Sequence, residues 1–185
     1  MKQCIQKHIN NKDFVKVYIS DKDDLQIERF QGYIFKQTKD FIIMNDFMDF
    51  FYDGFVILRK RDIYEIKHSN DEKFFNKILV GEKIKKEVLN KYKELDLNLH
   101  SFEKIFESIF KTNLPVIVES KYGKDDIFQI GSIKKINKDN VKINYFNSRG
   151  EFDLKPVTAK YNKITSIKID TNYANTFFKY AKEIK

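Results

Sequence analysis

Apolar and polar residues alternate along several short segments of the chain. In residues 13–20 (DFVKVYIS), Val15, Val17 and Ile19 occupy every second position, which is the period of a strand with one buried face. Comparable segments follow at intervals in both halves of the sequence. The pattern predicts ten short strands, at residues 13–20, 32–35, 41–44, 55–58 and 63–66, and at residues 116–120, 129–134, 140–145, 157–160 and 164–169.

Other segments place apolar residues three or four positions apart, as an amphipathic helix does. The run from Phe102 to Phe110 has this spacing and stops before Asn113 and Pro115, which are typical of a helix end. Ser69 and Glu72 have the spacing of a capping box ahead of a second helix. We expect further helices around residues 5–9, 82–96 and 172–185. The fold class predicted is mostly β with flanking helices, an α+β arrangement.

The two halves of the sequence resemble each other. Residues 32–47 and 131–146 align without a gap and share 7 of 16 positions, and the flanking blocks recur in the same order. Self-similarity at a fixed period is the signature of repeated structural units. The sequence therefore predicts a tandem duplication, with a first helix-plus-barrel repeat at residues 1–80, a helical linker at 81–99 and a second repeat at 100–185.

Two short motifs in each half resemble those of the Sm-like family of small β-barrels. The first combines a glycine, an isoleucine two positions later, an aspartate and an asparagine. The second is a basic residue followed by two isoleucines. They occur as Gly32-x-Ile34, Asp40, Asn45 and Arg59-Lys60-x-x-Ile63-x-x-Ile66, and again as Gly131-x-Ile133, Asp139, Asn144 and Lys160-Tyr161-x-x-Ile164-x-x-Ile167.

The resemblance implies two tandem five-stranded Sm-like or SH3-like barrels, each preceded and followed by a helix. It also implies that comparable loops contact single-stranded RNA, through asparagine on a base edge, tyrosine stacking and cations on phosphate. The residues so implied are Asn45, Arg59, Lys60, Asn144, Lys160 and Tyr161. The alternative is that the asparagines end strands through backbone hydrogen bonds and that Arg59 and Lys160 simply face solvent.

An acidic and aromatic segment at residues 45–52 (NDFMDFFY) carries more large apolar side chains than the edge of one strand can bury. Phe47, Phe50, Phe51 and Tyr52 are the candidates for a protein interface there. The alternative is a loop that covers the open end of the barrel. The segment keeps a second class of function open, a protein-interaction or regulatory module such as an adaptor, an immunity protein or a phage counter-defence factor.

Catalytic and metal-binding motifs are not recognisable. We expect His8, His68 and His100 to lie in unrelated places, with no Cys or His near them at metal-ligand spacing. Residues 21–24 begin like a calcium loop but lack its glycine and closing glutamate, so they predict a polar turn. We expect a non-enzymatic protein without a metal or another cofactor.

Charge and composition bear on partners and location. The net charge is +8 and 31 of the 35 basic residues are lysine, which fits either nucleic-acid binding or AT-rich codon usage. The single Cys4, the missing secretory signal and the absence of any stretch of about 20 apolar residues predict a cytoplasmic protein that does not span a membrane. The partners expected are RNA or a protein, with the repeats forming a pseudo-dimer within the chain or a homo-oligomer.

Overall fold

The structure is a computed structural model that describes residues 2–20, 27–120 and 127–181. The polar turn predicted at 21–24, with its calcium-like sequence, lies outside the described residues. The chain forms two compact units, Met1–Asp96 (unit 1) and Leu97–Lys185 (unit 2). Most of the predicted linker, up to Asp96, thus belongs to unit 1.

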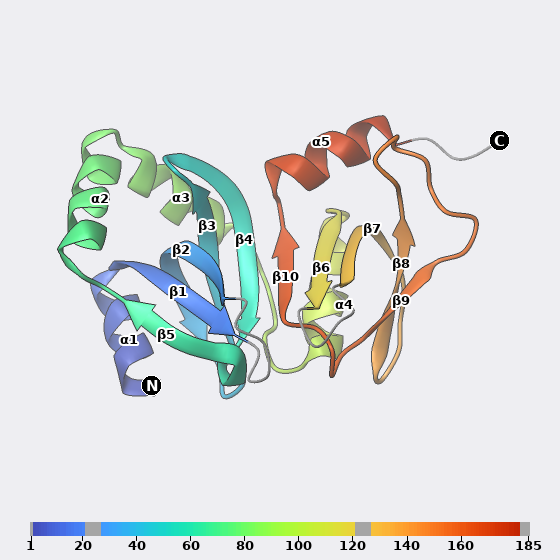
Figure 1. Cartoon of the computed structure of the whole chain (residues 1–185), viewed down its shortest axis with the longest axis horizontal. Coiled ribbons are helices and arrows are strands. Elements are labelled where there is room, and N and C mark those ends of the chain that lie inside the picture. Colours follow the sequence, from blue (N-terminus) through green and yellow to red (C-terminus); the bar gives the residue numbers. More distant parts are fainter. Residues whose placement is uncertain (1, 21–26, 121–126, 182–185) are drawn as a thin grey trace. The chain divides into compact units, whose positions relative to one another are not determined.

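Unit 1 contains three helices and five strands among its described residues (Figure 1). They are α1 (Lys2–Asn11), β1 (Phe14–Ser20), β2 (Ile27–Gln37), β3 (Phe41–Met48), β4 (Phe51–Arg59), a 3-10 turn at Lys60–Asp62, β5 (Ile63–Lys67), α2 (Asn70–Gly81) and α3 (Ile84–Lys93). The strands pair antiparallel in the order β5-β1-β2-β3-β4.

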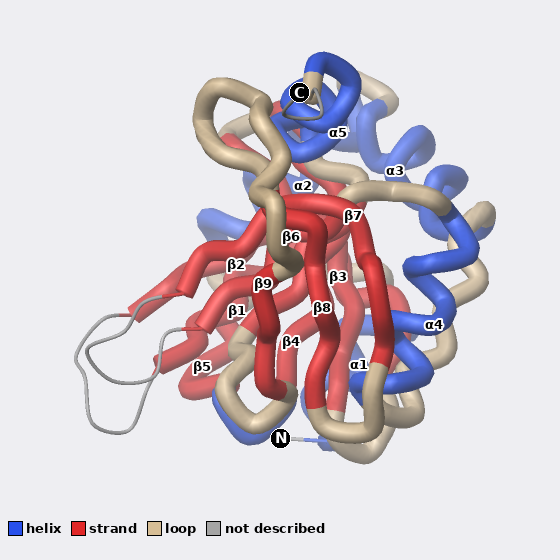
Figure 2. The backbone as a smooth tube through the Cα atoms, turned by 90° about the vertical axis from the view of Figure 1, so that its right-hand side faces the viewer, coloured by secondary structure: helices blue, strands red, loops and turns tan. Residues whose placement is uncertain are grey.

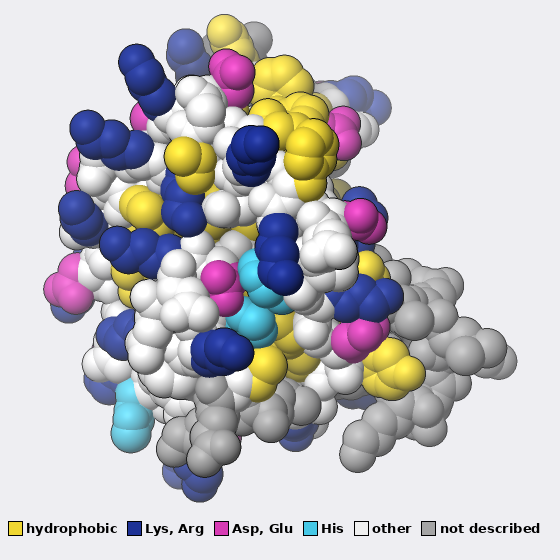
Figure 3. All heavy atoms as spheres, turned by 90° about the vertical axis from the view of Figure 1, so that its left-hand side faces the viewer, with side chains coloured by type: hydrophobic (Ala, Val, Ile, Leu, Met, Phe, Trp, Pro, Cys, Tyr) yellow, Lys and Arg dark blue, Asp and Glu magenta, His cyan; other side chains and the backbone are white. Residues whose placement is uncertain are grey.

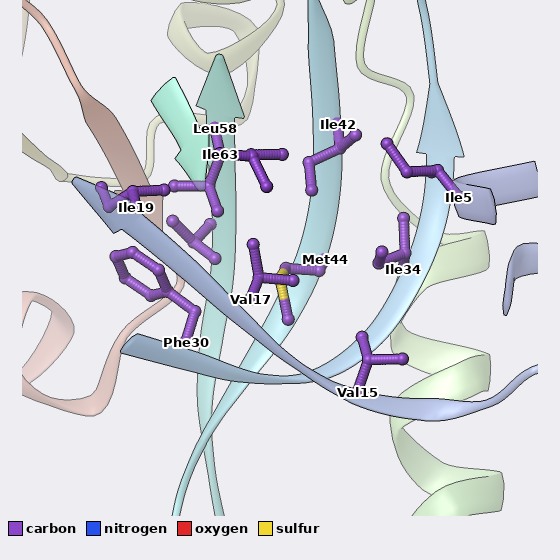
Figure 4. Packing of buried hydrophobic residues seen from close by; sticks show 11 residues of the cluster. Ile5, Val15, Val17, Ile19, Phe30, Ile34, Ile42, Met44, Leu58 and Ile63 are labelled. Carbon is purple, nitrogen blue, oxygen red and sulfur yellow. The ribbon is translucent and has the colours of Figure 1, made fainter. Parts of the chain in front are cut away.

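Strand β1 shows how the sequence builds unit 1. Val15, Val17 and Ile19 are buried on one face of β1 and pack with residues of β2, β3 and β4. Figure 4 shows Val17 lying against Met44 of β3 in this cluster. Fully burying one such side chain stabilises the folded state by about 1.5–3 kcal/mol. The alternation of apolar and polar residues therefore determines which face of β1 covers the core.

The opposite face of β1 receives α2. Phe14 stacks on Phe75 of α2, with ring centroids 4.7 Å apart, and Lys16 forms an ion pair with Glu72, with Nζ 2.9 Å from Oε1. The predicted capping box is confirmed, because Ser69 and Glu72 bond each other's backbone and side chain at the start of α2. These contacts hold α2 on the sheet.

Unit 2 contains two helices and five strands among its described residues, and these elements follow one another in a similar order. They are α4 (Phe102–Thr112), β6 (Val116–Ser120), β7 (Ile127–Ile136), β8 (Asn140–Tyr145), β9 (Val157–Lys160), β10 (Ser166–Ile169) and α5 (Asn172–Tyr180). Asn113 ends α4 in the left-handed conformation, as the sequence predicts. Figure 2 shows β7, β8 and β9 side by side, with α4 packed along β7.

The two units share their strand order and several local details. The order β10-β6-β7-β8-β9 in unit 2 corresponds strand by strand to that of unit 1. The register of β2 against β3 shifts between Ile34 and Lys36, and that of β7 against β8 shifts between Ile133 and Lys135. Such a shift bends a strand at that position, so both sheets bend at the same point of the aligned sequence.

A glycine next to each bend allows close approach of the neighbouring strand. A β-carbon on Gly32 would lie 2.3 Å from the main-chain oxygen of Asn45, and one on Gly131 would lie 1.9 Å from that of Asn144. Non-bonded heavy atoms essentially never lie within 3.0 Å of a β-carbon. The Gly and Asn of the first motif are therefore neighbours across two strands in each unit.

The fold class is confirmed at the coarse level, since strands predominate and helices flank them. Closed five-stranded barrels are not present among the described residues: β4 and β5 are the two ends of the strand order in unit 1 and do not pair with each other. Strands β2 and β3, at 11 and 8 residues, also continue well beyond the predicted segments.

Candidate functional site

Unit 1 contains an open cavity of about 690 Å³. It lies among the end of α1, the middle of β2, the end of α2 and the outer face of α3. Its lining combines apolar and aromatic side chains with several lysines. The lining residues are Ile9, Lys12, Tyr33, Ile34, Phe35, Val80, Lys83, Lys85, Lys86, Leu89, Asn90, Tyr92 and Lys93.

Helix α3 is positioned over β2 by aromatic packing. The ring of Tyr92 stacks on that of Phe35 with centroids 4.2 Å apart and planes 10° from parallel. Val88 of α3 is buried in the cluster that contains Phe14 and Tyr33. The apolar stripe seen in residues 82–96 therefore packs on the sheet, and the same helix turns its lysines toward the cavity and solvent.

Lys85 is held within the cavity wall. Its Nζ donates hydrogen bonds to the main-chain oxygen of Lys12 at 2.9 Å and to Oδ1 of Asn76 at 3.0 Å. It also lies 4.9 Å from the centre of the Tyr33 ring. Burial lowers the pKa of Lys85, and Lys12 adds to this while Asp13 opposes it. Lys85 thus stabilises the wall, whereas Lys12, Lys83, Lys86 and Lys93 are exposed.

Tyr33 forms the polar floor of the same region. Its hydroxyl donates to Oδ1 of Asn76 at 2.9 Å, and burial raises the pKa of Tyr33 above its ordinary value. The phenol therefore stays neutral at physiological pH and acts as a hydrogen-bond donor.

The RNA-contact residues predicted in unit 1 are engaged within the protein. Asn45 is fully buried, and its Oδ1 accepts a hydrogen bond from the backbone N–H of Tyr33 at 2.8 Å. Arg59 is also buried and donates from Nε to Oδ2 of Asp62 at 2.8 Å. Lys60 is half-buried and its Nζ donates to Oε1 of Gln37 and to a main-chain oxygen. The structure therefore favours the alternative structural interpretation of Asn45, and it places Arg59 in the interior rather than facing solvent.

The corresponding residues of unit 2 differ in their exposure to solvent. Tyr161 is 8% exposed, stacks on Phe102 and Phe106, and donates its hydroxyl proton to the main-chain oxygen of Asn137 at 2.9 Å. Asn144 is half-buried in β8, and Lys160 is exposed at the end of β9. For a base to stack on Tyr161, the tyrosine ring would have to move away from α4. Lys160 is therefore the most accessible of the three RNA-contact residues predicted in unit 2.

The predicted protein-interface residues also differ in exposure. Phe47 is buried and Tyr52 is half-buried, with Lys91 4.2 Å from its ring centre. Phe51 is 76% exposed, and Phe50 is 43% exposed although one face stacks on Phe75. Only Phe50 and Phe51 of the four therefore present apolar surface to solvent.

The expectation that the histidines are unrelated is wrong for two of them. Antiparallel pairing of β1 with β5 brings His68 next to His8, with ring centroids 5.4 Å apart, and Asp13 lies between them. No local pattern indicates this proximity, because the two histidines are sixty positions apart in the chain. His100 lies in unit 2 and is exposed.

The lysine-rich cavity was not predicted from the sequence. Residues 83–93 indicate part of this cavity, because lysines there are interspersed with apolar residues. The cavity also needs residues of α1 and β2, which only the fold brings next to α3.

No protein-family model, no curated protein and no solved structure matches the chain. Among the described residues, no helix has both the length and the apolar character needed to cross a membrane.

Proposed function

We propose that the chain is a non-enzymatic binding module made of two copies of one Sm-like unit. The equivalent strand orders, the register shifts at Ile34 and Ile133, and the close approach of each motif glycine to an asparagine support a common origin of the units. In this proposal each unit is an open form of the small barrel, and the chain carries its own pair of units.

The ligand we propose is single-stranded RNA, bound at the cavity of unit 1. The observation that carries the proposal is the combination of exposed lysines around the cavity with aromatic and aliphatic side chains inside it. Single-stranded nucleic acid is bound by this combination, because cations neutralise phosphates while apolar and aromatic surfaces receive the bases.

The charge and shape of α3 agree with this ligand. Its sequence, IKKEVLNKYK, contains four lysines and one glutamate. The stacked pair of Phe35 and Tyr92 gives the cavity an aromatic wall, and Asn90 adds an amide at the lining that can donate to or accept from a base edge. The site differs from the loops implied by the family resemblance, whose Asn45, Arg59 and Tyr161 are occupied by internal contacts.

The proposal is tested by fluorescence anisotropy with a labelled mixed-sequence single-stranded RNA over a range of salt concentrations. The test variant is Lys86→Gln with Lys93→Gln, two exposed lysines of the cavity rim. The control variant is Lys73→Gln with Lys77→Gln, which removes the same charge from exposed positions of α2 outside the lining. If two phosphate contacts are lost, the slope of log K against log salt should decrease in magnitude by about 1.4 in the test variant and remain unchanged in the control.

An equal decrease in RNA affinity and in salt slope in the two variants would mean that binding depends only on net charge, and would refute the cavity as the site. Absence of binding by the unmodified protein at low salt would refute RNA as the ligand.

A second candidate function is supported by one specific observation. Met48 and Phe51 are 65% and 76% exposed, and the acidic residues Asp49 and Asp53 lie in the same segment. This surface suits a protein partner that carries apolar and basic residues. Binding of an amphipathic lysine-rich helical peptide should be lost in Phe51→Ser and retained in Phe128→Ser, a change at an exposed phenylalanine of unit 2; equal binding by both variants would exclude the surface.

A further inference from the structure

The carboxylate of Asp13 lies between two histidine rings in unit 1. His8 Nδ1 is 2.9 Å from Asp13 Oδ2, and His68 Nε2 is 3.8 Å from Asp13 Oδ1. A ligand atom from each of the three residues can be chosen so that all lie within 4.8 Å of one another. Figure 3 shows histidine and acidic side chains gathered in the middle of one face, with lysine and arginine side chains around them.

The backbone fixes the three residues in place. His8 is in the last turn of α1, and Asp13 follows after Lys12, which has a positive φ of 52° and turns the chain into β1. His68 follows β5, which pairs with β1. The cluster therefore joins the end of a helix to two adjacent strands, which are rigid elements suited to holding ligands.

Each histidine has its second ring nitrogen held by a neighbour. The Nδ1–H of His68 donates to the main-chain oxygen of Phe14 at 2.9 Å, and His8 Nε2 lies 3.4 Å from Cys4 Sγ. Metal-binding histidines commonly have such an outer partner, which sets the tautomer and the ring orientation.

The tautomer of His68 has a consequence for the centre of the cluster. With its proton on Nδ1, neutral His68 presents the lone pair of Nε2 to Asp13 Oδ1 at 3.8 Å, so two acceptors face each other. The distance is also too long for a hydrogen bond. A cation between the two atoms satisfies both.

We propose that His8, Asp13 and His68 form a binding site for a divalent transition-metal ion of the Zn²⁺ type. Two neutral imidazoles and one carboxylate are the ligands that such ions prefer, whereas Ca²⁺ and Mg²⁺ need mainly oxygen ligands. Ligand atoms around tetrahedral zinc lie about 3.4 Å apart. The two distances from Asp13, 2.9 and 3.8 Å, bracket this value, and the ligand atoms of the two histidines lie within 4.8 Å of each other, so side-chain rotations can bring all three to one ion.

The exposure of the cluster leaves room for a fourth ligand. The side chains of His8, Asp13 and His68 are 9%, 18% and 21% exposed, so solvent reaches the site and water completes the tetrahedron. Lys85 interacts electrostatically with Asp13, so its positive charge lowers the affinity of the carboxylate for a cation.

The test is isothermal titration of the metal-stripped full chain, prepared without a histidine tag, with Zn²⁺. We expect saturable binding of one ion per chain and an increase in melting temperature. His68→Gln should weaken Zn²⁺ binding at least tenfold, whereas His100→Gln, at an exposed histidine of unit 2, should bind as the unmodified chain does. Equal affinity in all three proteins, or no saturable binding by the unmodified chain, overturns the proposal.

Co²⁺ absorption of the unmodified chain provides a second measurement that does not depend on a variant folding. Tetrahedral d–d bands without a thiolate charge-transfer band support the ligand set of two histidines and one aspartate. A thiolate band that disappears in Cys4→Ser overturns that set, because Cys4 would then be a ligand. The absence of tetrahedral bands at saturation overturns the site itself.

Discussion

Replacing Gly32 by alanine should destabilise unit 1 through a backbone collision. The added β-carbon would lie 2.3 Å from the main-chain oxygen of Asn45, whereas ordinary contact begins at 3.4 Å. The two strands must therefore separate by about 1 Å at this point. Because β2 pairs with β3, this movement also disturbs the hydrogen-bonded ladder on either side of the site.

Overpacking of this kind costs about 1–3 kcal/mol and occasionally more. We expect Gly32→Ala to lose about 3 kcal/mol of unfolding free energy, since the colliding atom is backbone and cannot rotate away. Gly131→Ala should lose at least as much, because its β-carbon would lie only 1.9 Å from the main-chain oxygen of Asn144. Equivalent losses at both positions would support the proposal that the two units are copies of one design.

Gly81→Ala is the matched control. Gly81 is the exposed last residue of α2, and a β-carbon there meets no atom within 4 Å. Alanine in a helix is favoured over glycine by roughly 0.5–1 kcal/mol, so the control should be neutral or slightly stabilised. Urea denaturation followed by circular dichroism gives the three free energies. A Gly32→Ala protein whose stability lies within about 0.5 kcal/mol of the Gly81→Ala control would show that the close approach of β2 and β3 does not require glycine at position 32.

Two further predictions concern buried charges in unit 1. Arg59→Ala should lower the unfolding free energy by roughly 1–3 kcal/mol, because it leaves the buried Asp62 without the 2.8 Å hydrogen bond from Arg59; unchanged stability in urea denaturation would restore Arg59 as a candidate surface residue. Glu72→Gln should reduce the loss of stability on acidification: burial raises the pKa of Glu72, but hydrogen bonds from Lys16 and Ser69 outweigh it and lower that pKa from 4.5 to about 2. The ionised carboxylate therefore stabilises the fold above pH 4.5, and this contribution disappears as the pH falls from 4.5 toward 2. Melting temperatures measured across that range should converge for the two proteins, and parallel curves would contradict the assignment.

The positions of most strands and helices could be predicted because they depend on local patterns. The alternation in residues 13–20 and the capping box at Ser69 each reflect the burial or hydrogen bonding of neighbouring residues. Strand ends were less accurate: β2 extends to both sides of the predicted residues 32–35, because pairing with two neighbours continues a strand beyond its most apolar part.

The candidate sites were harder to predict because a motif does not show what its side chains contact. The family resemblance implied that Asn45 and Tyr161 contact RNA, yet one bonds the backbone of Tyr33 and the other packs on α4. The His8 and His68 cluster depends on pairing between β1 and β5. Such contacts join residues distant in the sequence, so only the fold reveals them.

Mapping amide chemical shifts of the labelled chain during titration with a short RNA would locate single-stranded RNA at or away from the lysine-rimmed cavity of unit 1. We expect the largest shifts in α3 and in the middle of β2, around Tyr33 and Phe35, with saturation. Shifts concentrated instead around Lys160 in unit 2, or no shifts at saturating RNA, would contradict RNA binding at the cavity.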